Sequence, residues 1–176
     1  MLLRKINAIL SLLTTLFLLN HAIFSSVRML SKGSVEQSAP FAPWILTGLM
    51  AAHAFISIML AFSAIFEGEK CKCKSYPKMN RSTIIQRVSG ILLMVFTALH
   101  ITGTTGVFNP PHIVHAIVHP LFFAIALMHT AVSVDKAFIT LGIGNAKFVK
   151  AVSIVTKLIC AAILIAAVAG LYVYIW

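Results

Sequence analysis

Charged residues are scarce in this chain, and acidic ones are nearly missing: 10% of the 176 residues are charged, and only four are Asp or Glu. Hydrophobic residues make up 60%, and several apolar runs reach the roughly 20 residues that a helix needs to cross a bilayer. The segments between these runs are too short to hold a soluble domain. We therefore expect one integral-membrane domain over residues 1–176, without repeats or low-complexity segments.

The apolar runs predict five transmembrane helices and an all-α fold, because open strands cannot satisfy their backbone hydrogen bonds in lipid. The expected spans are, approximately, Ile6–Val27, Pro43–Phe66, Thr83–Gly106, Ile113–Leu141 and Ala151–Ile175. The first span is too long for a cleaved signal peptide and lacks a small-residue cleavage site, so we expect it to remain in the protein.

Cysteine is also scarce, and three cysteines do not make a disulfide framework. Cys71 and Cys73 fall in a loop that we expect in the cytoplasm, where thiols stay reduced. A C-x-C pair alone supplies too few ligands for a zinc or iron–sulfur site. Cys160 is expected to pack between helices or to face lipid.

The net charge of +10 indicates a membrane topology rather than nucleic-acid binding. With five spans, twelve of the fourteen basic residues fall on one side of the membrane, and only Arg28 and Lys32 fall on the other. The positive-inside rule then places the N-terminus in the cytoplasm and Trp176 outside the cell membrane. The basic face also suits the docking of a partner protein.

One histidine falls in each of the first four spans: His21, His53, His100 and His129. A histidine at bilayer depth is costly unless it has a partner, and we expect no acidic residue at that depth. Four imidazoles on four helices match two axial ligands for each of two haem irons. For any single one of these histidines, an interhelical hydrogen bond remains the alternative.

Depth suggests how the four histidines pair. His21 and His100 lie about 24 Å and 20 Å from the basic edge of their helices, in the outer half of the membrane, and are expected to share one haem. His53 and His129 then share the inner haem. Their depths agree less well, at about 15 Å and 27 Å from the opposite edge, and His119 is the rival ligand.

The three remaining histidines occur at positions i, i+3 and i+7: His112, His115 and His119. This spacing places them on one face of a helix, near its outer end. They are candidates for a proton relay, for contacts to a quinone, or for simple interfacial polar residues, and the sequence leaves these readings open.

The third span carries a more specific pattern. Residues 86–90 read Q-R-V-S-G, and Phe96 and His100 follow in the same span. This pattern resembles the Q-R-[IV]-[ST]-G…F…H helix of dihaem cytochrome b subunits of succinate:menaquinone oxidoreductases and quinol:fumarate reductases. The stretch from His129 to residue 142 is similar to that family's H-x-x-[NS]-G…F-x-I-T-W-G pattern. Ser133 replaces the family's glycine, and Leu141 replaces its tryptophan. Five spans with histidines on the first four also match the family's layout.

The resemblance implies two b haems, with metal ligands His21, His53, His100 and His129. It also implies menaquinone in the membrane, and an iron–sulfur subunit and an FAD-containing subunit on the cytoplasmic side. In this reading the chain is the electron-transfer subunit of a succinate dehydrogenase or fumarate reductase complex and carries no substrate chemistry itself. Bis-imidazole ligation leaves no open iron position, which favours electron transfer over oxygen chemistry.

Four further residues are expected to contact the cofactors. Gly90 would let a flat macrocycle approach the backbone. Ser89 would bond back into its own helix or reach a haem propionate. Arg87 and Arg28, at opposite ends of their spans, would neutralise haem carboxylates.

Two other functions remain open from the sequence. A dihaem cytochrome b could serve a different flavoenzyme or an extracellular electron acceptor. A haem-free transporter or assembly protein could use the histidines to conduct protons or to bind a metal.

Overall fold

Five long helices make up the described part of the chain, which covers residues 1–33, 41–70, 81–104 and 112–175 of a computed structural model. Side chains are described for residues 1–33, 41–63, 81–103 and 117–173. The helices are α1 (Leu2–Leu30), α2 (Ala42–Lys70), α3 (Arg81–Thr104), α4 (His112–Leu141) and α5 (Ala146–Ile175). No strand occurs within these ranges, so the all-α prediction is confirmed.

All five helices are long and apolar enough to cross a membrane, which confirms a multi-pass membrane protein by length and composition. The largest difference from the expected bounds is at α5, which begins at Ala146 rather than at Ala151. Asn145 precedes this helix, and its Oδ1 accepts a hydrogen bond of 3.0 Å from the backbone N–H of Phe148. The apolar pattern missed this first turn, in which Lys147 and then Lys150 interrupt the apolar residues. The expected end of the third span, Gly106, lies outside the described residues.

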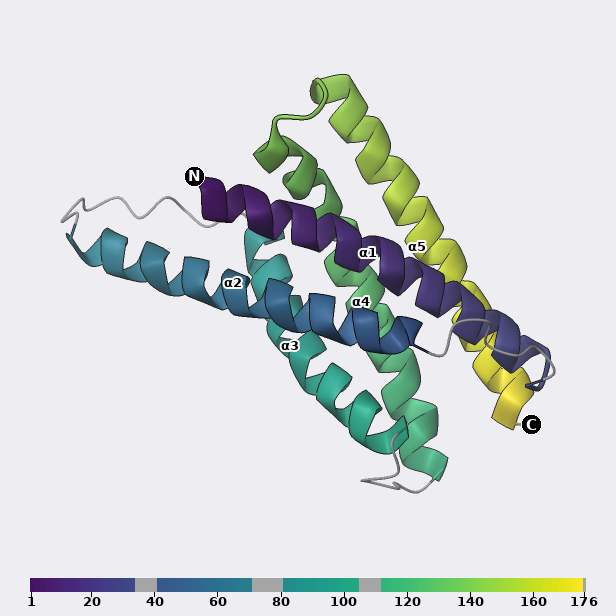
Figure 1. The fold of residues 1–176 in the computed structure, drawn as a ribbon. Helices are drawn as coiled ribbons and strands as arrows, with labels where there is room; N and C mark the ends of the chain where they lie inside the picture. The colour runs from purple at the N-terminus through teal and green to yellow at the C-terminus, as the bar shows by residue number, and fades with distance from the viewer. Residues whose placement is uncertain (34–40, 71–80, 105–111, 176) are drawn as a thin grey trace.

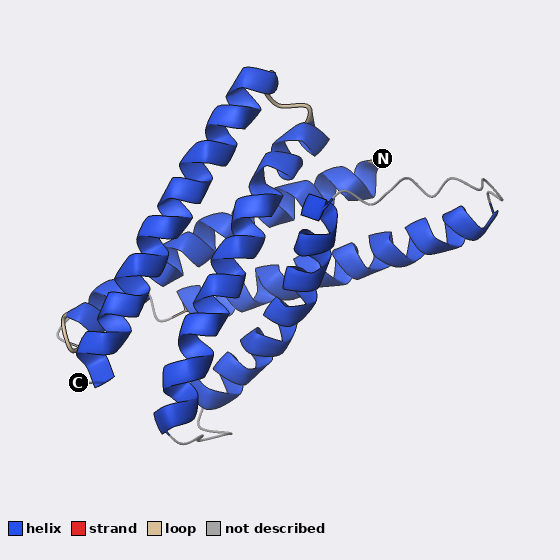
Figure 2. Cartoon of the chain, turned by 180° about the vertical axis from the view of Figure 1, so that it is seen from behind, coloured by secondary structure: helices blue, strands red, loops and turns tan. Residues whose placement is uncertain are grey.

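The helices form two crossed layers. Helices α1 and α2 run side by side in one layer, and α3, α4 and α5 form the layer behind it (Figures 1 and 2). Helix α4 packs extensively against α3, α5 and α1, while α1 also packs against α2 and α5. Helices α1 and α4 are therefore the centre of the bundle, and contacts between them join the two layers.

The chain alternates in direction from one helix to the next. The starts of α1, α3 and α5 and the ends of α2 and α4 gather at the upper left of Figure 1, and the opposite ends gather at the lower right. The first of these ends carries most of the basic residues that the structure describes: Arg4, Lys5, Arg81, Arg87, Lys136, Lys147 and Lys150. We call it the basic end; "inner" below means toward it, and "outer" means away from it.

Two apolar clusters hold the bundle together. The first joins four helices through Leu18, Leu46, Leu93, Ile125 and Ala126. The second joins α1, α4 and α5 through Ala22, Leu127, Cys160 and Ile163. Cys160 is only 4% exposed, so of the two alternatives for this residue the structure shows packing between helices.

Helices α1 and α5 approach most closely through small residues. A Cβ added to Gly170 would lie 3.0 Å from the backbone oxygen of Ser26 and 3.1 Å from the Cβ of Met29. Ser26 is 2% exposed, and its hydroxyl donates a 2.7 Å hydrogen bond to the backbone oxygen of Ala22. Close backbone packing of this kind is how helices associate in lipid, where the hydrophobic effect does not drive them together.

Candidate functional site

The four span histidines lie on four helices and on both layers of the bundle. His21 on α1 and His53 on α2 come from one layer, and His100 on α3 and His129 on α4 come from the other. Each pair expected from the sequence therefore takes one imidazole from each layer. A flat cofactor between the layers would be held from both faces.

The outer pair is brought together. The ring centres of His21 and His100 are 6.4 Å apart, with their planes at 75°. A metal–imidazole nitrogen bond is about 2 Å long and the ring centre lies about 1 Å behind the nitrogen, so two imidazoles on opposite sides of one metal have centres about 6 Å apart. The separation of His21 and His100 fits that arrangement.

His119 lies at the same outer pair. Its ring centre is 5.7 Å from that of His100, with the planes at 64°. The ring centre of Phe122 is 5.2 Å from that of His100, and Phe122 stacks on Phe96 with ring centres 6.4 Å apart. His119 thus lies beside His100, as His21 does, whereas the depth argument made it a rival ligand at the inner site.

The inner pair is arranged differently. The Nδ1 atom of His129 lies 2.9 Å from the hydroxyl of Ser89. His53 is close enough to His129 for the two imidazoles to interact electrostatically. The Nδ1 atom of His53 is buried and has no hydrogen-bond partner among the described residues. The half-buried imidazole also bonds to the backbone of Asn7, and its unsatisfied Nδ1 is suited to binding a ligand that the chain itself does not supply.

Ser89 and Gly90 both face His129. The Ser89 hydroxyl also donates to the backbone oxygen of Gln86 at 3.2 Å, so its expected bond back into its own helix is confirmed. A Cβ on Gly90 would lie 3.2 Å from Cε1 of His129. The room that this glycine leaves is thus taken by the imidazole, where we had expected a macrocycle to come near.

Arg28 and Arg87 lie at the helix ends that were predicted from the sequence. Arg28 is in the last turn of α1, and Arg87 lies near the start of α3 at the basic end. Both are exposed, which leaves their guanidinium groups available to carboxylates at the two membrane surfaces. The side chains of His112 and His115, and the whole of the segment with Cys71 and Cys73, lie outside the described residues.

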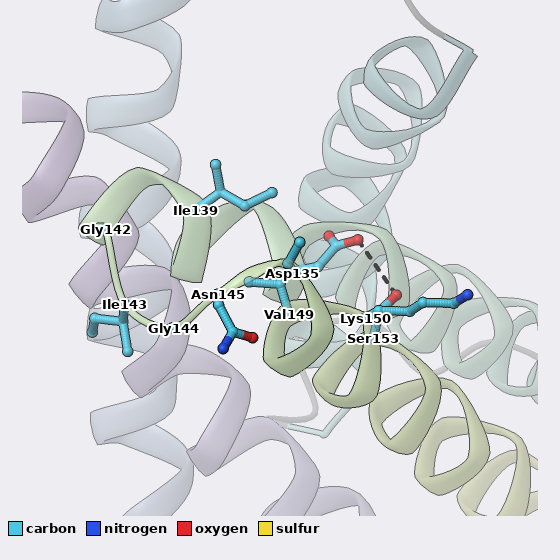
Figure 3. A pocket seen from close by; sticks show the side chains of 10 residues that line it. Asp135, Ile139, Gly142, Ile143, Gly144, Asn145, Val149, Lys150 and Ser153 are labelled. Carbon is cyan, nitrogen blue, oxygen red and sulfur yellow. Dashed lines mark hydrogen bonds between the residues drawn. The ribbon is translucent and has the colours of Figure 1, made fainter.

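The expectation that no acid lies at bilayer depth is wrong, because Asp135 falls within the candidate span Ile117–Leu141. Its Oδ1 accepts a 2.8 Å hydrogen bond from the backbone N–H of Lys136, and its Oδ2 accepts one of 3.4 Å from the hydroxyl of Ser153. Asp135 and Ser153 line a pocket of about 500 Å³ at the turn between α4 and α5 (Figure 3). Asp135 is near the inner end of its span and bonds to α5, so it does not replace a ligand for the histidines.

Two polar contacts between helices carried no signal in the sequence. Lys136 Nζ donates a 2.8 Å hydrogen bond to Oε1 of Gln86, which joins α4 to α3. The amide of Asn7 bonds to the Ser57 hydroxyl at 3.1 Å, which joins α1 to α2. The members of each pair are 50 residues apart. Spacing rules cover positions three or four apart on one helix and do not reach such pairs.

Three buried hydroxyl groups have no hydrogen-bond partner in the part of the chain that is described: those of Thr14, Thr97 and Ser133. They lie on α1, α3 and α4, and each is three, four or seven residues from the histidine of its helix, which places it on that histidine's face. An unsatisfied buried hydroxyl costs about 1–3 kcal/mol. Polar groups of this kind on the histidine-bearing faces fit a cofactor with polar substituents.

Among the described residues, no group of three or more His, Cys, Asp or Glu side chains could hold a bare metal ion. Haem iron differs, because the porphyrin supplies four ligands and the protein only two, and pairs of imidazoles are what this bundle brings together. Comparison of the chain with protein-family models, with curated proteins and with solved structures finds no match. The functional assignment accordingly depends on the residues and their geometry.

Proposed function

We propose that this chain is a dihaem cytochrome b membrane anchor of the succinate:menaquinone oxidoreductase or quinol:fumarate reductase type. It carries electrons between menaquinone and a cytoplasmic iron–sulfur subunit with its FAD-containing partner. The observation that carries the proposal is the pairing of His21 with His100 across the two layers, at a ring separation of 6.4 Å.

The polypeptide's part is to hold two cofactors at two depths. His21 and His100 would ligate the outer haem, and His53 and His129 the inner one. Each bound haem would supply a reversible one-electron redox centre. Two imidazoles at each haem would leave no position for oxygen on the iron, which favours electron transfer.

The spacing of the two sites follows from α4. His119, at the outer pair, and His129, at the inner pair, are ten residues apart, or about 15 Å along the helix. The first apolar cluster, with Leu93 and Ile125, lies between these levels in the sequences of α3 and α4. It excludes water from the space between the two sites and keeps the local dielectric constant low.

The basic end would face the cytoplasm. Lys and Arg side chains there favour retention on the cytoplasmic side and attract an acidic protein surface, such as that of the iron–sulfur partner. Arg87 at this end and Arg28 at the other would bind the haem propionates, because a guanidinium binds a carboxylate by two parallel hydrogen bonds.

The test is direct reduction by a quinol. We expect a water-soluble menaquinol analogue to reduce the purified chain in detergent, with the appearance of a b-type α-band in the reduced-minus-oxidised spectrum. A His100→Ala variant should lose part of that band. Purified chain without any b-type band would contradict the proposal.

The outer histidines also favour one function of another class. Three imidazoles, those of His21, His100 and His119, follow one another at 6.4 Å and 5.7 Å. Such a series could pass protons in a haem-free membrane protein. The same spectrum separates the two proposals, because a proton-handling protein shows no haem absorption.

A further inference from the structure

Ser89 is completely buried, at 0% exposure, at the contact between α3 and α4. Its hydroxyl has two neighbours: the backbone oxygen of Gln86 at 3.2 Å and Nδ1 of His129 at 2.9 Å. A serine hydroxyl has one proton to donate and lone pairs to accept with. The two contacts together therefore constrain where the proton of His129 lies.

A backbone oxygen can only accept a hydrogen bond, and the backbone oxygen of Gln86 lies 3.2 Å from the Ser89 hydroxyl, so it is an acceptor for the hydroxyl proton. With the proton given to Gln86, the hydroxyl oxygen accepts from the Nδ1–H of His129. We propose that Ser89 is a positioning residue that holds His129 as the Nδ1–H tautomer and presents its Nε2 lone pair to the inner haem site. This inference rests on the proposed function for the haem, but the tautomer itself is a property of the chain alone.

The surroundings keep this arrangement in place. Gly90 leaves room for the imidazole to lie against α3, because Cε1 of the ring is 3.2 Å from the position of an added Cβ. Helix α3 is joined to α4 a second time, by the 2.8 Å hydrogen bond that Nζ of Lys136 donates to Oε1 of Gln86. Lys136 is seven residues beyond His129, two turns along the same face of α4. The two contacts fix how α3 and α4 lie against each other at the level of the ligand.

Hydrogen bonds from the second ring nitrogen of a metal-bound histidine usually set its tautomer and raise its basicity as a ligand. Loss of such a partner typically weakens metal binding 10- to 100-fold. We therefore expect Ser89→Ala to weaken retention of the inner haem by about 10-fold, and to raise its midpoint potential because the imidazole donates less electron density. The outer haem should keep its potential.

Two variants make this test specific. Ser89→Thr retains a hydroxyl and should restore the inner haem's retention and potential. Ser26→Ala is the matched control, because Ser26 is equally buried, at 2% exposure, but bonds only to Ala22 in its own helix. Changes in Ser26→Ala as large as those in Ser89→Ala would assign the effect to packing and overturn the inference.

The deciding measurement is made on the haem-free chain. Nitrogen NMR of ¹⁵N-histidine-labelled protein, with His129→Ala to assign the signal, should show a protonated Nδ1 and an unprotonated Nε2 at His129. In Ser89→Ala the backbone of Gln86 still bonds to the imidazole, so we expect the share of the Nε2–H tautomer to rise above that in the unaltered chain. A protonated Nε2 in the unaltered chain would overturn the inference even if two haems bind. Absence of haem binding, with the tautomer as expected, would instead contradict only the proposed function.

Discussion

The inner and outer histidine pairs are built by different means. At the inner pair, hydrogen bonds between α3 and α4 fix the site. His129 on α4 bonds to Ser89 on α3, and Lys136 on α4 bonds to Gln86 on α3. At the outer pair, rings pack against rings: His100 contacts His21, His119 and Phe122.

This difference has a consequence for how each site is organised. Hydrogen bonds have defined directions, so they fix the orientation of the inner imidazole before any cofactor binds. Aromatic contacts tolerate several geometries, so the outer rings can adjust to what lies between them. We expect the inner site to be sensitive to single polar changes, and the outer site to changes that alter how helices pack.

The largest effect should come from removing an inner ligand. We expect His129→Ala to lose the inner haem, which halves the haem content of the purified chain, because no second imidazole is placed on α4 at that level. Haem quantification against protein concentration measures this. His119→Ala is the control from the same helix and should keep both haems. If His119→Ala loses a haem while His129→Ala keeps two, the pairing must be reversed.

The outer site can be tested by a competition between two neighbours of His100. We expect His21→Ala to lose the outer haem or to convert its spectrum, since His119 at 5.7 Å is close enough to take its place. The double variant His21→Ala/His119→Ala should then lose the outer haem completely. Electron paramagnetic resonance distinguishes these states by their low-spin signals. An unchanged spectrum in the His21→Ala variant would show that His21 is not a ligand.

Packing at α1 offers a test of intermediate size. Gly170→Ala places a Cβ 3.0 Å from the backbone oxygen of Ser26, five residues from His21, and overpacking of this kind costs about 1–3 kcal/mol. We expect lower thermal stability and a perturbed outer haem, with the inner one unaffected. Gly48→Ala is the matched control, because nothing lies within 4 Å of its added Cβ. Equal losses in both variants would contradict close packing of α1 on α5.

The smallest effect should come from the polar contact between α1 and α2. Asn7→Ala removes its hydrogen bonds with Ser57, which lies one turn from His53. Hydrogen bonds between membrane helices contribute about 0.6 kcal/mol on average, so we expect a slightly lower unfolding free energy in detergent. The inner haem should dissociate somewhat faster than the outer one. A faster loss of the outer haem instead would show that this contact does not support the inner site.

The helices could be predicted from sequence because each is a long apolar run with few charges, and the five spans were recognised to within a few residues at most ends. The start of α5 was missed because Lys147 and Lys150 interrupt the apolar run there; the Asn145 cap stabilises this first turn. Asp135 lies inside the fourth predicted span, and the sequence alone does not show which group it bonds to. A side chain near a span end can bond to the next helix, as Asp135 does to Ser153.

The candidate site was predictable in its histidines but not in its contacts. One imidazole per span is apparent from the chain, and helix rise is sufficient to pair His21 with His100. The place of His119 depends on how α3 and α4 cross, which no periodicity describes. The same holds for Ser89 and His129, which are 40 residues apart. Contacts of this kind arise only when two layers pack together.

The central claim is that the bundle holds two haems, each between one imidazole from either layer. Its most direct test is the haem content and spin state of the purified, unaltered chain. The account predicts two b haems per chain, both low-spin and six-coordinate, with a b-type α-band on reduction. One haem per chain, a high-spin five-coordinate iron, or no haem at all would contradict it.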